Sequence, residues 1–411
     1  MYISRHIEAV VRRISKRKSV VVLTGARQVG KSTMLKEVFG DINYITLNRP
    51  LVRESAKENP SLFFEMNSPP IIVDEIQKAA ELFDYIKDVV DEDESKSKGR
   101  FYLTGSQSLK LMKNVSESLA GRAGVIKMLG LSMREISQSS YRKPFTPSDD
   151  HLFNFEKEKH DINFNRMISY IHKGFFPELY ETESDLYDWA DYYNSYFQTY
   201  IEKDIHDVLN IRDESAFIKF VKATAANTGS MLNMNTLAET CGKDIKTIRA
   251  WLSVLESSGL VYLLEPYYNN LNKRLVKSPK LYFLDTGFAC WLLGWNTPEQ
   301  MVNGAMWGNI FESFVFSEVL KSYYNDGIVR PPIYYYRNHD KSEIDLLIED
   351  GDSLYPIEIK TTSDPSKSMV SSFKCIENIP NKKVGQGALI CMVNKCLPLK
   401  ENVWSVPACS V

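Results

Sequence analysis

The sequence predicts a multi-domain α/β protein, and three observations support this fold class. Residues 1–135 alternate short apolar runs of strand length with longer amphipathic stretches. Residues 297–411 begin with a helical stretch and continue with further strands. The chain has 411 residues, more than one hydrophobic core usually holds, and at about 150 residues per domain two or three domains are expected.

Composition and charge exclude several classes of protein. With 44% hydrophobic and 25% charged residues, the chain is not wholly disordered, collagen-like or a coiled-coil rod. A net charge of −2 excludes a globally basic nucleic-acid coat but not a local basic patch. No apolar run approaches the roughly 18 residues that span a bilayer, and the six cysteines form no C-x-x-C pair. We therefore expect a cytoplasmic protein without membrane spans or a zinc site.

The strongest motif is a glycine-rich loop between a predicted strand, 20–24, and a predicted helix that starts at Thr33. It reads Gly25-Ala-Arg-Gln-Val-Gly30-Lys31-Ser32 and fits the P-loop pattern G-x-x-x-x-G-K-[ST]. The glycines let successive backbone N–H groups face phosphate oxygens, Lys31 can reach the β and γ phosphates, and Ser32 can bind Mg²⁺. The alternative is a chance glycine-rich turn, which the order of strand, motif and helix disfavours. The predicted ATP-binding residues are Gly25, Ala26, Arg27, Gln28, Val29, Gly30, Lys31, Ser32 and Thr33.

Two carboxylates follow the next apolar run in Pro70-Ile-Ile-Val-Asp74-Glu75. A buried strand would deliver both to its carboxyl end. Asp74 would then hold Mg²⁺ and Glu75 would orient and deprotonate the attacking water. An acidic turn after a strand is common, so the pattern is informative only because the P-loop precedes it. Together the two motifs predict an ATPase rather than a passive nucleotide binder.

A third strand, Phe101-Tyr-Leu-Thr-Gly-Ser106-Gln107, ends in polar groups that we expect beside the γ-phosphate. Ser106 or Gln107 could sense that phosphate. Arg122 is a candidate to neutralise charge in the transition state, either in its own chain or from a neighbouring subunit. A plain surface salt bridge is an equally good interpretation of Arg122.

Four segments together resemble the AAA-type prokaryotic ATPases that carry a C-terminal domain of unknown function, DUF4143. They are Leu23-Thr-Gly-Ala-Arg-Gln-Val-Gly-Lys-Ser, Ile72-Val-Asp-Glu-Ile-Gln, Leu103-Thr-Gly-Ser-Gln and Ser116-Glu-Ser-Leu-Ala-Gly-Arg. The resemblance extends over nearly the whole chain. It implies an AAA-type core, a winged-helix region and a nuclease-like C-terminal domain, and it makes a homo-oligomer plausible because a neighbour's arginine often completes such sites. Ser32 stands where Thr is frequent, and either hydroxyl can coordinate Mg²⁺.

Residues 233–261 have a helix-turn-helix layout. Leu237 and Ala238 belong to a first short helix, Gly242 marks the turn, and two strand-like runs between 262 and 284 enclose a predicted wing at Asn269–Arg274. The apolar face of the second helix is predicted to comprise Ile245, Ile248, Leu252 and Leu255.

This segment is locally basic, which leaves two interpretations open. Between 241 and 280, three acids are outnumbered by seven basic residues, Lys243, Lys246, Arg249, Lys273, Arg274, Lys277 and Lys280. One interpretation is DNA contact, with Lys246 and Arg249 in the major groove and Lys273 and Arg274 on phosphate. The other is a winged helix used only for packing.

The C-terminal region contains a second set of carboxylates. Glu312 lies in a predicted helix, Asp345 in a strand, and Glu358 and Lys360 two residues apart on the next strand, so that they share one face. Carboxylates at Glu312, Asp345 and Glu358 could hold Mg²⁺, and Lys360 could orient a water. The pattern resembles the PD-(D/E)xK restriction-endonuclease-like fold, with Ile-Asp in place of Pro-Asp. A retained but inactive fold is the alternative.

We therefore predict a P-loop AAA-type ATPase core at 1–135, a helical region at 136–225, a winged helix at 226–296 and a PD-(D/E)xK-like α/β domain at 297–411. ATP and Mg²⁺ are the expected cofactors, and DNA is a possible partner. The first functional hypothesis is an ATP-regulated DNA-processing enzyme. The alternatives are a nucleotide-gated binding switch with an inactive nuclease-like fold and a protein-remodelling ATPase.

Overall fold

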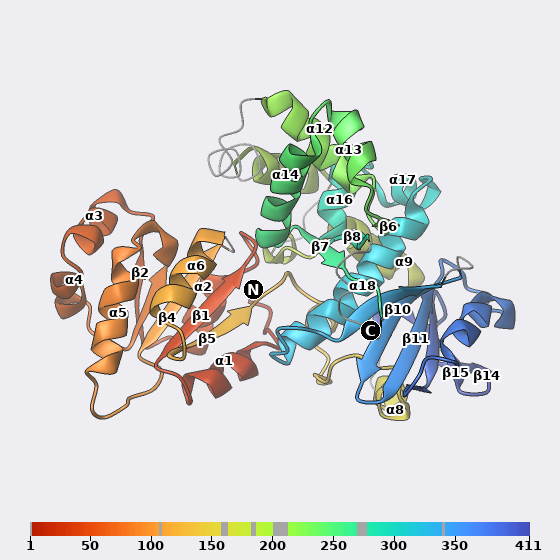
Figure 1. Ribbon diagram of the computed structural model, residues 1–411, viewed down its shortest axis with the longest axis horizontal. Coiled ribbons are helices and arrows are strands. Elements are labelled where there is room, and N and C mark those ends of the chain that lie inside the picture. The colour runs from red at the N-terminus through yellow and green to blue at the C-terminus, as the bar shows by residue number, and fades with distance from the viewer. Residues whose placement is uncertain are drawn as a thin grey trace.

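The computed structural model describes residues 2–106, 109–157, 163–181, 186–199, 213–268, 278–338 and 342–411, and these form three β-sheets joined by helices (Figure 1). The first sheet comes from the N-terminal third of the chain. The second is small and lies in the middle of the chain, and the third is C-terminal. The predictions for the wing, Asn269–Arg274, and for Gln107 lie outside the described residues.

The first sheet is parallel throughout, with the strand order β2-β3-β4-β1-β5. Its strands are β1 (Val20–Gly25), β2 (Asn43–Thr46), β3 (Ile71–Asp74), β4 (Phe101–Ser106) and β5 (Ala123–Lys127). The helices are α1 (Glu8–Ser15), α2 (Lys31–Val38), α3 (Pro50–Glu58), α4 (Pro60–Met66), η1 (Ile76–Lys78), α5 (Glu81–Asp91) and α6 (Leu109–Ser118). The predicted α/β fold with parallel strands is confirmed.

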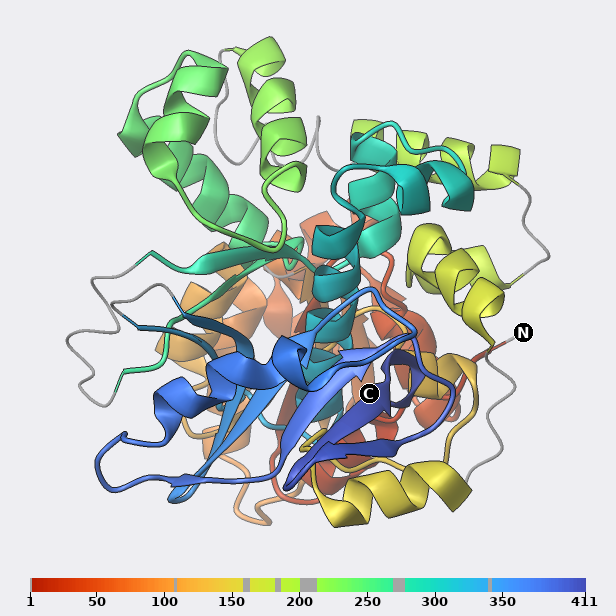
Figure 2. The same ribbon diagram turned by 90° about the vertical axis from the view of Figure 1, so that its right-hand side faces the viewer.

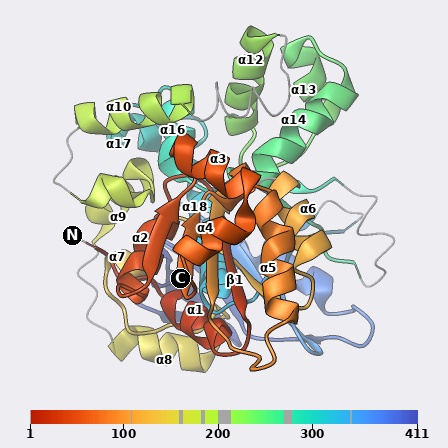
Figure 3. The ribbon, with the colours of Figure 1, turned by 90° about the vertical axis from the view of Figure 1, so that its left-hand side faces the viewer.

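Helices cover both faces of this sheet, as Figure 3 shows. Val21 and Leu23 of β1 belong to the core that includes α1 and α2, whereas Val20 and Val22 belong to the core that includes α3 to α6. Successive side chains of a strand point to opposite faces, so a strand buried on both faces is apolar at every position. This explains the continuous β-branched run in the sequence.

A group of helices follows the first sheet. They are α7 (Met133–Ile136), α8 (Asp149–Lys157), α9 (Phe164–Lys173), η2 (Pro177–Tyr180) and α10 (Leu186–Tyr196). Many of the aromatic residues in this part of the chain are buried, among them Trp189, Tyr193, Tyr196 and Phe197, whereas Phe164 at the start of α9 is 42% exposed. The sequence-based interpretation of these aromatics as core is therefore confirmed.

The second sheet has the antiparallel order β6-β8-β7. The chain order is α12 (Glu214–Ala225), β6 (Ser230–Met231), α13 (Met234–Cys241), α14 (Ile245–Ser257), β7 (Val261–Leu264) and β8 (Lys280–Phe283), followed by α16 (Thr286–Leu292) and α17 (Pro298–Asn303). Gly242 ends α13 in the left-handed conformation, with φ of 63°. Ile248, Leu252 and Leu255 are buried as predicted. The prediction for Ile245 is wrong: its side chain is 42% exposed because the first turn of α14 extends beyond the core.

The third sheet is mixed, with the order β14-β15-β13-β11-β10-β9 and β12 beside β11. Its elements are α18 (Trp307–Asn325), β9 (Ile333–Arg337), β10 (Glu343–Asp350), β11 (Ser353–Ile359), η4 (Lys367–Ile376), β12 (Lys383–Val384), β13 (Gly387–Cys391), β14 (Leu397–Lys400), β15 (Val403–Pro407) and η5 (Ala408–Ser410). β10 and β11 form an antiparallel hairpin with Leu346 opposite Ile357, as the spacing of Asp345 and Glu358 predicts.

Helix α18 connects all three sheets. It lies between the first and third sheets in Figure 1 and behind the third sheet in Figure 2. Ser317 donates to the carbonyl of Leu284 just after β8 (2.8 Å), and Glu318 accepts from the backbone N–H of Met133 in α7 (2.7 Å). The helix is buried almost continuously from Ile310 to Tyr324, and its buried charges Glu318 and Lys321 pair with each other (2.7 Å). None of the helices in the described part of the chain has both the length and the apolar character needed to cross a bilayer.

Candidate nucleotide-binding site and C-terminal carboxylate cluster

The glycine-rich loop connects the carboxyl end of β1 to the first turn of α2. Gly25 has φ of 152° and Gly30 has φ of 89°, conformations that favour glycine. A Cβ atom on Gly25 would lie 2.0 Å from the carbonyl oxygen of Met128, so no larger residue fits there. The loop thus has the backbone that the P-loop motif requires, with the positive end of a helix behind it.

Lys31 extends back across this loop. Its Nζ donates to the carbonyl oxygens of Gly25 (3.1 Å) and Ala26 (2.7 Å). Burial lowers the pKa of Lys31 to about 8, although nearby Glu75 and Asp74 raise it. The ammonium therefore lies inside the loop, where phosphate oxygens would compete with two carbonyls for its protons.

Asp74, at the end of β3, is the centre of a hydrogen-bond network. Its Oδ1 accepts from Ser32 (2.5 Å) and from Thr104 of β4, and its Oδ2 accepts from Tyr44 (3.0 Å) and Thr46 (3.2 Å) of β2. Burial, and then Asp74, raise the pKa of Tyr44 to about 12. Mg²⁺ usually binds proteins through one or two carboxylates together with substrate phosphates and waters, so Ser32 and Asp74 fit this ion.

Glu75 follows in the left-handed conformation, with φ of 58°, which is uncommon for a residue with a side chain. Its Oε2 accepts from Nε2 of Gln77 (2.5 Å), and the same nitrogen donates to the hydroxyl of Ser106 (3.2 Å). A Cβ atom on Gly105 would lie 2.3 Å from Oε1 of Gln77, so a larger residue there would displace this amide. The sequence analysis missed Gln77, and its only sequence signal is the position two residues after Glu75.

Arg122 lies near the amino ends of the strands, whereas the loop lies at their carboxyl ends. Ala123, the residue after Arg122, pairs with Val20 at the amino end of β1. Val20 is five residues before Gly25, so about 17 Å of strand separates the two ends of β1. The Arg122 guanidinium forms a bidentate ion pair with Asp91 (both N–O distances 2.5 Å). The prediction that Arg122 acts on the phosphate of its own chain is therefore wrong, because the strand length separates them. A role in a neighbouring subunit stays a prediction.

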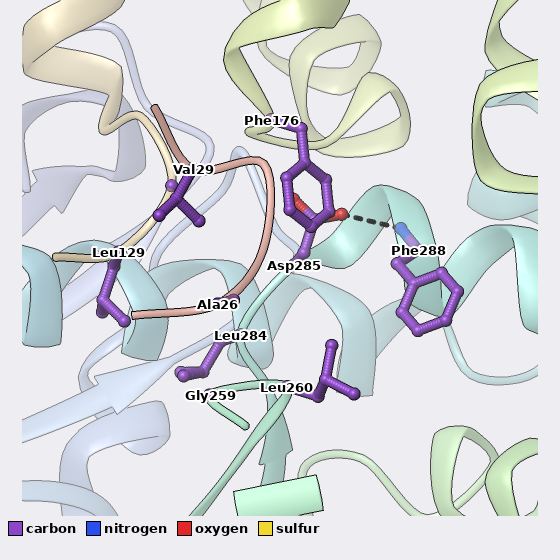
Figure 4. A pocket seen from close by; sticks show the side chains of 10 residues that line it. Ala26, Val29, Leu129, Phe176, Gly259, Leu260, Leu284, Asp285 and Phe288 are labelled. Carbon is purple, nitrogen blue, oxygen red and sulfur yellow. Dashed lines mark hydrogen bonds between the residues drawn. The ribbon is translucent and has the colours of Figure 1, made fainter. Parts of the chain in front are cut away.

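Residues far away in the sequence support the loop from behind. The guanidinium of Arg5 is buried and donates to the carbonyl oxygens of Val29 (2.9 Å), Leu129 (2.8 Å) and Gly130 (2.9 Å). A cavity behind the loop is lined by Ala26, Val29, Leu129, Gly130, Phe176, Gly259, Leu260, Leu284, Asp285 and Phe288 (Figure 4). Across this cavity the loop faces two segments, the residues just before β7 and those between β8 and α16. No sequence signal indicated either contact.

Asp285 forms one wall of this cavity and holds three segments together. It accepts from the backbone N–H of Phe288 (2.8 Å), which caps α16, from the backbone N–H of Phe175 (2.7 Å) and from the hydroxyl of Tyr193 (2.7 Å). Burial raises its pKa, although these hydrogen bonds lower it. The end of β8 is thus attached to the helical segment 164–196, and it lies across the cavity from the glycine loop.

The C-terminal residues Asp345, Glu358 and Lys360 come together as predicted. Nζ of Lys360 lies 2.9 Å from Oε2 of Glu358 and 3.3 Å from Oδ2 of Asp345, which also accepts from the backbone N–H of Ile359 (2.9 Å). Burial, and then the charge of Asp345, raise the pKa of Glu358 to about 8. Ser372 donates to the other oxygen of Glu358 (2.6 Å).

Glu312 pairs with a residue that the sequence analysis assigned elsewhere. Nζ of Lys280 lies 3.0 Å from Oε1 of Glu312, 2.6 Å from Oε1 of Glu343 and 3.8 Å from Oδ1 of Asp345. The Lys280 side chain is only 4% exposed. The excess of basic residues at 241–280 therefore does not lie wholly on the surface, because the Lys280 ammonium is buried among carboxylates.

The predicted metal ligands Glu312, Asp345 and Glu358 surround two ammonium groups. Within the described residues, no group of three or more His, Cys, Asp or Glu side chains is placed to hold a metal ion. The three carboxylates are paired with these two ammonium groups instead, and so they do not fit the divalent cation that the nuclease-like resemblance implies. The physical reason is that Lys280 and Lys360 already neutralise them.

The remaining predicted DNA contacts differ in exposure. Lys246 and Arg249 of α14 are exposed, whereas Lys243 pairs with Asp213 (2.6 Å). Lys273, Arg274 and Lys277 lie outside the described residues. The described part of this surface therefore offers two exposed basic residues on one helix.

Strand, glycine loop and helix, with Ser32 beside Asp74 at the strand ends, define an α/β protein of the P-loop nucleotide-binding class. Comparison with family models adds the following. Residues 17–137 match the model described as "AAA domain", residues 307–410 match "Domain of unknown function (DUF4143)", and residues 165–299 match "Domain of unknown function (DUF8612)". The chain therefore contains an AAA domain and a DUF4143 domain.

Whole-length relatives and solved structures add names but no activity. Two uncharacterized proteins, Rv2008c of Mycobacterium tuberculosis and Mb2031c of Mycobacterium bovis, are each 28% identical over 98% of this chain and 83% of their own length. The Walker-type ATPase PABY2304 of Pyrococcus abyssi aligns over 71% of this chain and 96% of its own, at 13% identity and a TM-score of 0.43. The Orc1 protein of Aeropyrum pernix, solved in complex with DNA, covers 68% of this chain and 90% of its own, at 14% identity and a TM-score of 0.27.

Proposed function

We propose that this protein binds ATP with Mg²⁺ at residues 25–33 and hydrolyses it to ADP and phosphate. The observation that carries the proposal is the contact of Ser32 with Asp74 beside the glycine loop. A hydroxyl and a carboxylate joined in this way, next to a buried lysine, form the protein's share of a magnesium–phosphate site. The AAA domain match at 17–137 supports the same activity.

Each residue of the site has a distinct task in this reaction. The loop N–H groups and the Lys31 ammonium bind the phosphates, and Ser32 and Asp74 supply protein ligands on the metal side. A bound Mg²⁺ would neutralise charge that develops on the phosphate oxygens. Glu75 orients the attacking water and accepts its proton, and Gln77 positions the Glu75 carboxylate. Ser106, the predicted sensor of the γ-phosphate, accepts from the same Gln77 amide.

We further propose that α14 contacts DNA through Lys246 and Arg249. The support is the order of α12, β6, α13, α14, β7 and β8, which is that of a winged helix, and the exposure of these two residues on the second helix of the pair. Use of the same unit for packing alone stays the alternative. We also keep the proposal of a homo-oligomer in which Arg122 acts at the nucleotide site of a neighbouring subunit.

For the C-terminal domain, the second functional hypothesis is better supported. A nucleotide-gated binding protein needs no metal at Asp345, and the Lys280 and Lys360 ammonium groups occupy the space among the carboxylates. We therefore propose an ATPase whose DUF4143 domain has a PD-(D/E)xK-like arrangement without nuclease activity. The proposed function is thus ATP hydrolysis coupled to binding.

The test is ATP turnover by the purified full-length chain, with and without duplex DNA. Lys31→Ala should abolish ATP binding, and Glu75→Gln should retain binding while turnover falls by about 10²–10⁴-fold. Lys57→Ala and Glu58→Gln, exposed on α3, are the matched controls and should behave as wild type. Folded wild-type protein that takes up no Mg-ATP would refute the proposal. If DNA does not change ATP turnover and the protein does not bind DNA, α14 serves only in packing.

A further inference from the structure

Lys280 lies at the meeting point of three segments that are distant in the sequence. It is the first residue of β8, and its ammonium reaches Glu312 of α18 and both Glu343 and Asp345 of β10. Tyr282, two residues on and on the same face of β8, donates to Oε1 of Glu312 (2.6 Å). We call Lys280, Glu312, Glu343 and Asp345 the Lys280 cluster.

The ammonium occupies the position that a cation ligated by Glu312 and Asp345 would take. Mg²⁺ needs ligand oxygens at about 2.0–2.1 Å, so an ion held by both carboxylates would be in contact with Nζ of Lys280. Both oxygens of Asp345 face a positive or donor group: Oδ1 lies 3.8 Å from Nζ of Lys280, and Oδ2 accepts from Lys360 and from the backbone N–H of Ile359. Two positive charges in direct contact repel each other strongly in a buried site.

The surrounding backbone holds Lys280 in this place. Tyr267, beyond β7, donates from its backbone N–H to the carbonyl oxygen of Tyr335 in β9 (2.6 Å). The hydroxyl of Tyr335 in turn donates to the carbonyl oxygen of Ser278, two residues before Lys280 (2.5 Å). The approach to β8 is therefore attached to the third sheet, and this attachment places the Lys280 backbone beside the carboxylates.

We propose that the Lys280 ammonium replaces a divalent metal ion in the DUF4143 domain, so that the carboxylates bind β8 instead of catalysing DNA cleavage. The cluster then joins the second sheet to the third, and β8 continues from it to Leu284 and Asp285, which line the cavity behind the glycine loop. The Lys280 ammonium thus forms ion pairs, within one chain, with the carboxylates that would otherwise bind a metal ion. This explains why carboxylates at nuclease-like spacing have no room for a metal ion between them. This inference does not depend on the proposed ATPase activity.

The experiment measures manganese uptake by the full-length chain without nucleotide, using isothermal titration calorimetry. Every protein also carries Asp74→Asn, so that an ion at the nucleotide site is not counted. The proteins are the Lys280-intact chain, Asp345→Asn with Lys280 intact, Lys280→Ala, Lys280→Ala with Asp345→Asn, and Lys222→Ala as a control that removes an exposed lysine of α12. Circular dichroism checks that each is folded, and Lys280→Gln replaces Lys280→Ala if the latter unfolds.

We expect no saturable uptake by the Lys280-intact chain or the Lys222→Ala control. Lys280→Ala should take up one manganese ion per chain, and Asp345→Asn should remove that uptake. Manganese binding by the Lys280-intact chain that Asp345→Asn abolishes would overturn the proposal. A folded Lys280 variant that gains no manganese would overturn it as well.

Discussion

The hydroxyl of Ser32 donates a 2.5 Å hydrogen bond to Oδ1 of Asp74, although 42 residues separate them. Strand β4 lies between β1 and β3, and Thr104 of β4 donates to the same oxygen. The network therefore joins the first turn of α2 to three neighbouring strands. Because Asp74 is held from four sides, its position is determined before any substrate arrives.

Gln77 should affect the rate of hydrolysis and not the binding of ATP. Its amide holds Glu75 at 2.5 Å and Ser106 at 3.2 Å, so Gln77→Ala releases the carboxylate that orients water. We expect kcat to fall by about tenfold while KM stays within about twofold. Lys78→Ala is the matched control, because the Lys78 side chain donates to Asn48 and its only contact with Glu75 among the described residues is a backbone hydrogen bond that alanine keeps. Steady-state kinetics that show a change in KM alone would contradict a positioning role.

Binding of ATP should take up a proton above the pKa of Lys31. Burial lowers this pKa to about 8 from the ordinary value of 10.5, so the amine is mostly neutral at about pH 9. Phosphates favour the charged form and raise the pKa again. Calorimetry in two buffers with different ionisation heats should therefore show proton uptake at about pH 9 and almost none at about pH 7.

The same pKa has a consequence for stability. Below about pH 8 Lys31 is charged in both the folded and the unfolded state, and burying this charge destabilises the folded state. That cost is lost as the pH rises from about 8 towards 10.5, so the contribution of Lys31 to stability improves over this range. Lys31→Met should remove both the proton uptake and this part of the pH dependence. Equal proton uptake at both pH values would contradict the lowered pKa.

Arg122→Ala should leave ATP affinity within about twofold of wild type, because five residue steps of β1, about 17 Å, separate Arg122 from the loop. Lys31→Ala, titrated in parallel, should lose binding. A large loss of affinity in Arg122→Ala would contradict this placement of the side chain.

The role in trans makes a separate prediction: turnover per chain rises with protein concentration in wild type and not in the variant.

The double variant Lys246→Ala, Arg249→Ala should bind DNA more weakly than wild type, and its binding should depend less on salt. For every phosphate that the variant no longer neutralises, the slope of log affinity against log salt should become shallower by about 0.9. Lys222→Ala, exposed on α12, is the control and should keep the wild-type slope. Unchanged binding by the double variant, measured by fluorescence anisotropy across a salt series, would exclude α14 as the DNA-binding helix.

Much of the nucleotide site could be predicted from the sequence because its information is local. The glycines, Lys31 and Ser32 lie within eight residues, and the buried strands before Gly25 and Asp74 are evident as continuous apolar runs. A parallel sheet brings the carboxyl ends of its strands to one edge, so the meeting of Ser32 with Asp74 follows from the strand pattern.

The sequence by itself determined the class of the first domain, the composition of its phosphate loop, and the closeness of Asp345, Glu358 and Lys360. The tertiary structure alone decided that Arg122 lies at the wrong edge of the sheet for its own site and that Lys280 is buried among carboxylates. The physical reason is that local spacing determines which face a side chain occupies. The partner that neutralises a buried charge can come from any part of the chain, and only packing selects it.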